Sequence, residues 1–212
     1  MCTRTSSAFL VGAFALAACV PAVDVGRAAP QKLAVPEARV IVAGPPGYCV
    51  DEQASRVSGA GGAFVLLGSC ASIAGSARAP KPSSPGVLTV TVADGLTGDA
   101  VIARTLDDLA AFFRTREGRA ALSRSGDPAS VEVLDIRLAE DTLYLRARDR
   151  SSDRGMSHDY WRALFGVNDR LLTVSVAGFE TRPMSPEAGW ATTEALADRI
   201  RAESAAYSGR SG

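Results

Sequence analysis

The chain has 212 residues, of which 23 are basic, 23 are acidic and 47 % are hydrophobic. This length fits one globular domain with a short extra segment, and it excludes a large multidomain enzyme. A formal net charge of zero provides no basic face of the kind that nucleic-acid binding requires, so we expect no nucleic-acid partner.

The N-terminus has the features of an export signal. Arg4 precedes an uncharged apolar run at residues 8–18, which is too short to span a membrane but has the length of the hydrophobic region of a secretory signal. The run ends in Leu16-Ala17-Ala18-Cys19, which resembles the lipobox of bacterial lipoproteins. This resemblance implies cleavage before Cys19 and lipidation of its sulfur. Since Val20 follows instead of an aspartate, it also implies sorting to the outer membrane, with the domain facing the periplasm.

An ordinary signal-peptidase site is the alternative. Ala15-Leu16-Ala17 has the small-x-small form that this peptidase accepts, and cleavage there would leave Cys19 as a plain thiol in a soluble periplasmic or secreted protein. In the lipoprotein interpretation, residues 1–18 are the signal and residues 19–38 form a lipidated tether rich in Ala, Pro and Val. Three acyl chains would then make the membrane anchor effectively permanent.

Two further cysteines, Cys49 and Cys70, remain in the exported chain, in a compartment where disulfides persist. Two thiols have only one intramolecular pairing, and closing a loop of about 20 residues contributes roughly 3 kcal/mol on the chain-entropy model. A redox pair usually has Cys-x-x-Cys spacing, and zinc needs four ligands, for which the single histidine, His158, is a poor supply. We therefore expect a structural disulfide.

Short apolar runs alternate with turn signals along the rest of the chain. They predict, in order, strands and helices at Arg39–Ala43 (strand), Ala63–Leu67 (strand), Val87–Ala93 (strand), about 105–123 (helix, with a capping box at Thr105–Asp108), Val131–Ala139 (strand), Leu143–Arg148 (strand), Tyr160–Val167 (strand), Leu171–Phe179 (strand) and 186 to about 206 (helix, with Ser185 as N-cap). Strands joined by short turns, together with two amphipathic helices, indicate the α+β class. We expect an antiparallel sheet of about six to seven strands packed by two main helices, in one domain of residues 39–206 with a loose tail at 207–212.

Motifs for catalysis are missing from the sequence. It contains no G-x-S-x-G, Walker or H-E-x-x-H pattern, so no cofactor and no metal ion is predicted. One polar cluster, formed by Asp149, Asp153, His158 and Asp159, lies in a loop predicted at Asp149–Asp159. We interpret it as a solvated loop between strands. The alternative is a hydrolase in which His158 forms an acid–base pair with Asp153 or Asp159.

A run of arginines lies near the C-terminal end of the first predicted helix. Arg114, Arg116, Arg119 and Arg124 favour the helix dipole there, while Asp107, Asp108 and Glu117 offset their charge. We interpret the run as a solvated helix face, with a docking surface for anionic lipid as the alternative.

The element order, the hairpin of Tyr160–Phe179 and the closing helix after Ser185-Pro186 resemble the PsbP-like domains over residues 39–206. These include an extrinsic photosystem subunit and small bacterial lipoproteins. The chain is also similar to small Ala/Arg-rich lipoproteins of alphaproteobacteria. The PsbP-like resemblance implies an antiparallel sheet between helices that acts, without catalysis, as an adaptor or stabiliser of a larger assembly. We therefore expect an outer-membrane lipoprotein that binds an envelope protein partner, with a carrier of a small apolar ligand or lipid as the alternative.

Overall fold

The structure is a computed structural model that describes residues 28–95, 97–151 and 155–209. Its nine described strands are β1 (Lys32–Val35), β2 (Val40–Ala43), β3 (Tyr48–Val57), β4 (Ala63–Ser69), β5 (Gly86–Val92), β6 (Val131–Ala139), β7 (Thr142–Asp149), β8 (Met156–Val167) and β9 (Arg170–Phe179). Its described α-helices are α1 (Cys70–Ile73), α2 (Asp99–Phe112), α3 (Arg116–Leu122) and α4 (Pro186–Ser208). Among the residues described, no helix is long and apolar enough to cross a bilayer.

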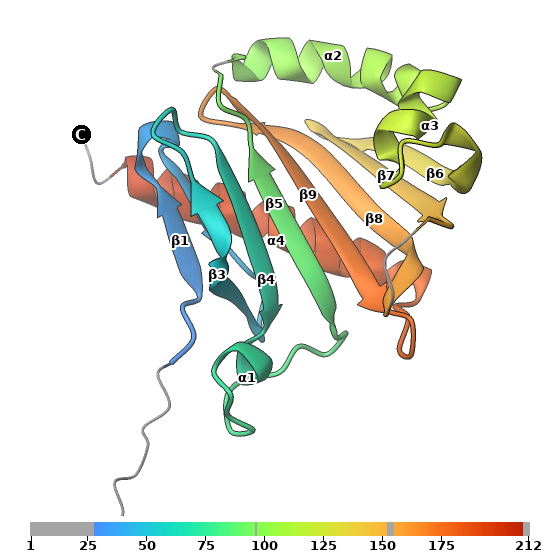
Figure 1. The fold of residues 1–212 in the computed structure, drawn as a ribbon. Helices are drawn as coiled ribbons and strands as arrows, with labels where there is room; N and C mark the ends of the chain where they lie inside the picture. The colour runs from blue at the N-terminus through green and yellow to red at the C-terminus, as the bar shows by residue number, and fades with distance from the viewer. Residues whose placement is uncertain (1–27, 96, 152–154, 210–212) are drawn as a thin grey trace, which may run out of the picture.

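Seven of the strands form one antiparallel sheet in the order β3-β4-β5-β9-β8-β7-β6. The chain builds half of the sheet from β3 to β5 and then passes through α2 and α3 (Figure 1). It starts again at the far edge with β6 and returns strand by strand, until β9 pairs with β5 at the centre. This arrangement confirms the predicted α+β class, the strand number and the two main helices, α2 and α4.

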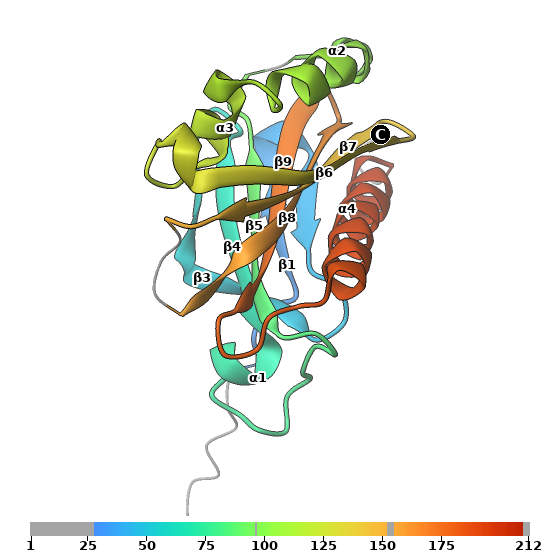
Figure 2. The same cartoon turned by 90° about the vertical axis from the view of Figure 1, so that its right-hand side faces the viewer.

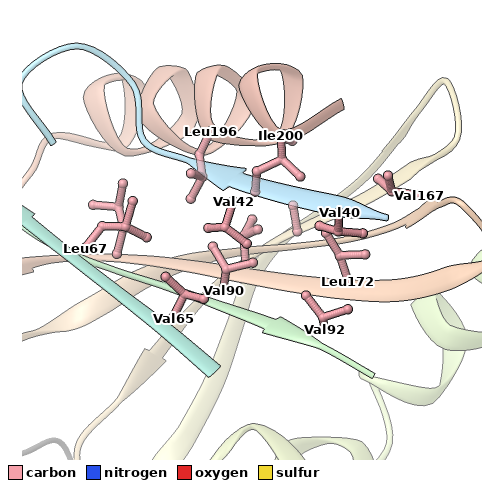
Figure 3. Packing of buried hydrophobic residues seen from close by; sticks show 14 of the residues in the cluster. Val40, Val42, Val65, Leu67, Val90, Val92, Val167, Leu172, Leu196 and Ile200 are labelled. Atoms are coloured by element: carbon pink, nitrogen blue, oxygen red, sulfur yellow. The ribbon is translucent and has the colours of Figure 1, made fainter. Parts of the chain in front are cut away.

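One face of the sheet is covered by α4 and by the two-stranded hairpin β1–β2. Alternate residues of β4, β5, β8 and β9 lie in this core, including Leu172 and Val174 of β9, while Leu196 and Ile200 of α4 pack onto them and are fully buried. Figure 3 shows Leu172, Leu196 and Ile200 in the layer between the helix and the sheet. Burial of such side chains supplies the main stabilisation of the fold, at about 25 cal/mol per Å² of apolar surface.

The opposite face is covered only in part. Helices α2 and α3 pack on β6, β7 and β8 through a second core that includes Ile102, Leu106, Leu143 and Leu145. Figure 2 shows these helices and α4 on opposite sides of the sheet. Over β4 and β5 this face carries half-buried side chains such as Phe64 and Leu66, and the short helix α1 contacts β4 only near its end, where Ile73 lies beside Gly68.

The domain begins earlier in the sequence than residue 39, where its N-terminal boundary was predicted. The tether was expected to reach residue 38, but Lys32–Val35 is strand β1, and Val35 is fully buried opposite Val40 of β2. A strand of four residues is too short to show a clear hydrophobic period. The segment was therefore interpreted as a tether from its composition alone. The predicted signal, Cys19 and the first part of the tether lie outside the described residues.

Three further elements differ from prediction. The polar stretch after Tyr48 is strand β3, which lies at the edge of the sheet. Its C-terminal half carries exposed polar side chains. The helix expected at 105–123 is two helices, since α2 already begins at Asp99 and Thr115 caps a separate α3 by accepting from Gly118 N at 3.0 Å. Helix α4 extends to Ser208, two residues beyond the expected end, and residues 210–212 of the expected tail lie outside the described chain.

Candidate functional site

The Cys49–Cys70 disulfide is present. Cys49 lies in β3 opposite Gly68 of β4, and Cys70 begins α1 two residues later. The two Cα atoms are 4.8 Å apart, and both cysteines are buried. The bond therefore connects the first strand of the sheet to the end of the second, as expected for a structural disulfide, and Cys19 lies outside the described residues.

Asp149 of the predicted polar cluster is held in place by hydrogen bonds within the protein. Its side chain is fully buried, and its carboxylate accepts from Arg124 N at 2.8 Å, from Ser130 Oγ at 2.9 Å and from both the N–H and the hydroxyl of Ser151. Burial alone would raise the pKa of this carboxyl, but these hydrogen bonds together hold the pKa below its ordinary value. Asp149 is thus an ionised residue that joins β7 to the segment following α3.

The side chains of Asp159 and His158 contact other groups than the carboxylate of Asp149 does. Asp159 accepts from Arg146 at 2.8 Å and from Arg148 at 2.6 Å. Burial opposes ionisation of Asp159, yet the two arginines hold its pKa below the ordinary value. His158 places Nδ1 3.0 Å from the backbone oxygen of Asp149, and Asp153 lies outside the described residues.

The two described carboxylates do not share one site. Asp159 lies beside Trp161 and Pro186 on the α4 face of the sheet, whereas Asp149 is bonded to residues on the α3 face. The structure therefore does not gather Asp149 and Asp159 around His158. Within the described ranges, no group of three His, Cys, Asp or Glu side chains could hold a metal ion.

The charged side chains on the α4 face of β6 and β7 are paired internally. Arg137 donates to Asp135 at 2.6 Å and lies 5.0 Å from the ring centroid of Trp190. Trp190 in turn packs against Trp161 with ring centroids 5.4 Å apart. Such a cluster of aromatic rings and ion pairs fastens the start of α4 to the sheet, and it leaves little uncompensated charge on that face.

A groove of about 580 Å³ lies on the other face, between α2–α3 and the edge strand β6. Its sides are formed by Arg114 and Arg119 and by residues 131–136 of β6. In the sheet of described strands, β6 pairs with β7 along one side and ends the strand order on the other. The groove therefore runs beside residues 131–136 of a nine-residue strand whose outer backbone edge has no strand partner in the described chain.

The two groove arginines keep their charge available. Arg114 donates to Ala110 O at 3.0 Å, and Arg119 donates to Arg114 O at 2.9 Å. Among the described residues neither has a carboxylate within ion-pair distance. Glu132 and Asp135 of β6 also line the groove, but Asp135 pairs with Arg137 and Glu132 lies 3.9 Å from Arg148.

The local sequence explains why the groove forms. A register shift between Val133 and Asp135 interrupts the pairing of β6 with β7, as a β-bulge does, and such bulges bend an edge strand. The break between α2 and α3 places Arg114 in the turn and Arg119 in the following helix. The arginine run was visible in the sequence, but nothing there indicated that it lies beside the last strand of the sheet.

Comparison with known proteins gives no further guidance. No family model matches the chain, and no curated protein matches it.

Proposed function

We propose that this chain is an exported, membrane-anchored lipoprotein of the cell envelope whose domain is a non-catalytic adaptor. The observation that carries the adaptor proposal is the open edge of β6 beside the groove that Arg114 and Arg119 line. An extended segment of a partner can add to such an edge, because its backbone supplies the hydrogen-bond partners that the edge strand lacks.

The charge of the groove defines the partner further. Two guanidinium groups without carboxylate partners among the described residues favour a segment that carries acidic side chains. The groove is open and follows residues 131–136 of a strand, which suits a peptide better than an enclosed apolar ligand. The proposed occupant is therefore an extended acidic segment of an envelope protein.

The export part of the proposal rests on other observations. The sequence ending in Cys19 resembles a lipobox, and the Cys49–Cys70 disulfide is typical of a protein that folds in an oxidising compartment. Intact-mass analysis of the mature protein tests this part by itself. We expect a chain that begins at Cys19 and carries lipid, and an unmodified chain beginning at Ala18 would contradict the anchor without touching the adaptor.

Site-specific photo-crosslinking in the native envelope tests the adaptor. A photoreactive residue at Leu138 of β6, which is 44 % exposed, is compared with one at Val57 of β3, which is 43 % exposed on the opposite edge. We expect a discrete adduct with another protein at Leu138 and none at Val57.

Charge reversal connects that adduct to the groove. In Arg114→Glu/Arg119→Glu we expect the Leu138 adduct to fall by at least about tenfold, because two attractive contacts become repulsive. Arg104→Glu/Arg116→Glu makes the same change of charge on α2 and α3 outside the groove lining, and should leave the adduct intact. Equal loss in both variants, equal adducts at both edges, or a covalent homodimer as the sole product would each refute the adaptor proposal.

A further inference from the structure

A second concave site lies on the partly covered face of the sheet, away from β6. It has a volume of about 180 Å³ and lies between the end of α3 and strands β5, β8 and β9. Arg124 and Arg162 both line it, together with apolar side chains. We call it the Arg162 pocket.

Arg162 is held in a fixed position in this pocket. Its Nε donates to Ser175 Oγ of β9 at 3.1 Å, and its guanidinium carbon lies 5.4 Å from the ring centroid of Tyr160. Tyr160 is itself fixed, because its hydroxyl donates to Leu122 O at 3.0 Å. The guanidinium is thus ordered in advance, and its terminal nitrogens have no hydrogen-bond acceptor among the described residues.

The pocket also has an excess of positive charge. The side chain of Arg124 has no carboxylate partner within the described part of the chain, although its backbone N–H binds Asp149. Asp149 is the nearby carboxylate, and its oxygens are occupied by backbone and hydroxyl donors. Two cations therefore line this pocket, whereas Asp149 is not part of the lining and already accepts hydrogen bonds from other groups.

The rest of the lining is largely apolar. Val87, Met156, Leu122 and Ala177 contribute to it, and Leu122 and Ala177 are buried. A pocket of this size holds about six water molecules at liquid density, which corresponds to a small organic molecule. Its chemistry therefore combines an anion-binding end with a short apolar compartment.

We propose that the Arg162 pocket binds the carboxylate of a small organic acid with a short apolar chain. The terminal nitrogens of Arg162 donate to the carboxylate in the bidentate geometry that guanidinium and carboxylate share, and Arg124 adds a second positive charge. The chain of the acid lies against Met156 and Val87. This site is separate from the β6 groove and does not depend on the adaptor function.

Titration of the purified full-length protein with hexanoate tests the proposal, with binding followed by calorimetry and by the NMR signal of Arg162 Nε–H. We expect saturable binding that shifts this signal. Hexanamide, which has the same chain without the charge, should bind at least about tenfold more weakly, because a charge-assisted contact is lost. Equal binding of the two compounds, or binding of inorganic phosphate but not hexanoate, would overturn the assignment.

Three variants complete the test. Arg162→Gln should weaken hexanoate binding by at least about tenfold, and Arg124→Gln, whose side chain is exposed and contributes no packing to the core, should weaken it to a smaller extent. Arg104→Gln removes the same charge from α2 outside the pocket and should leave binding unchanged. If both pocket variants bind hexanoate as tightly as Arg104→Gln does, the pocket is not the site.

Discussion

The disulfide gives the clearest quantitative prediction, through the variant Cys49→Ala/Cys70→Ala. The bond joins residues separated by 21 positions, and closing such a loop in the unfolded chain corresponds to roughly 3 kcal/mol. The folded state needs little from the bond, because β3 and β4 already pair Cys49 with Gly68 and Tyr48 with Ser69. We therefore expect the variant to keep its fold and to lose about 3 kcal/mol of unfolding free energy.

Urea unfolding followed by circular dichroism measures this loss. For a domain of this size the melting temperature should fall by about 6–12 °C. The dependence of the unfolding free energy on urea should be steeper in the variant, because an unfolded chain without the crosslink exposes more surface. Wild-type protein unfolded in the presence of reductant is the control and should behave like the variant. A variant within about 1 kcal/mol of the oxidised wild type would refute the loop-closure reasoning.

Three further substitutions test single features of the structure. Asp149→Asn should lower the unfolding free energy by about 1–3 kcal/mol at pH 7. Because the folded-state pKa of Asp149 is lowered, its stabilisation is present above the unfolded pKa and is lost as the pH falls, so the difference from wild type should shrink below about pH 4 in urea titrations. Arg170→Met removes a nearly buried side chain whose Nη1 donates to the backbone oxygens of Ala60, Ala93 and Asp94; thermal denaturation should show a loss of about 2 kcal/mol or more, and an unchanged melting temperature would contradict that role. Gly47→Ala introduces a Cβ that collides with the Lys81 carbonyl at a φ of +86°; we expect a loss of about 2 kcal/mol, whereas wild-type stability would show that the turn can relax.

The central strands could be predicted because each has one face in a core. Leu88 and Val90 of β5 and Val174 and Val176 of β9 alternate with polar residues, and the two strands pair in the structure. Strand β3 loses this signal after Asp51, whose Oδ1 accepts from the backbone N–H of Gln53 at 3.0 Å. That local turn interrupts the alternation, so a real strand has the pattern of a loop.

The first long helix shows how a local motif can mislead. Thr105 has the spacing of a capping residue, but in the structure it lies inside α2 and its hydroxyl donates to Ile102 O at 2.9 Å. The helix is also predicted to run to about residue 123, although residues 114–119 have no apolar side chain that would continue the period and Thr115 caps a new helix there. Hydrophobic spacing indicates which face of a helix is buried. Here it does not indicate where α2 ends and α3 begins.

The candidate sites depend on contacts that are distant along the chain. Asp149 and Asp159 are ten residues apart and look like one cluster, yet neighbouring positions on paired strands point to opposite faces, which separates them. Arg162 and Ser175 meet because β8 and β9 pair in one register. The position of β6 at the end of the sheet follows from the path of the whole chain, so no local pattern could reveal the groove beside it.

The two edges of the seven-stranded sheet differ, and this difference bears on self-association. At β3, Pro30 O accepts from Val50 N at 2.7 Å, and the strand register shifts between Asp51 and Arg56. A covering segment and an irregular register both hinder pairing with another strand. Two copies joined through β6 would present β3 at both outer ends, so growth by edge pairing would stop at a dimer. The fold can thus offer one strand for pairing while limiting its polymerisation into fibres.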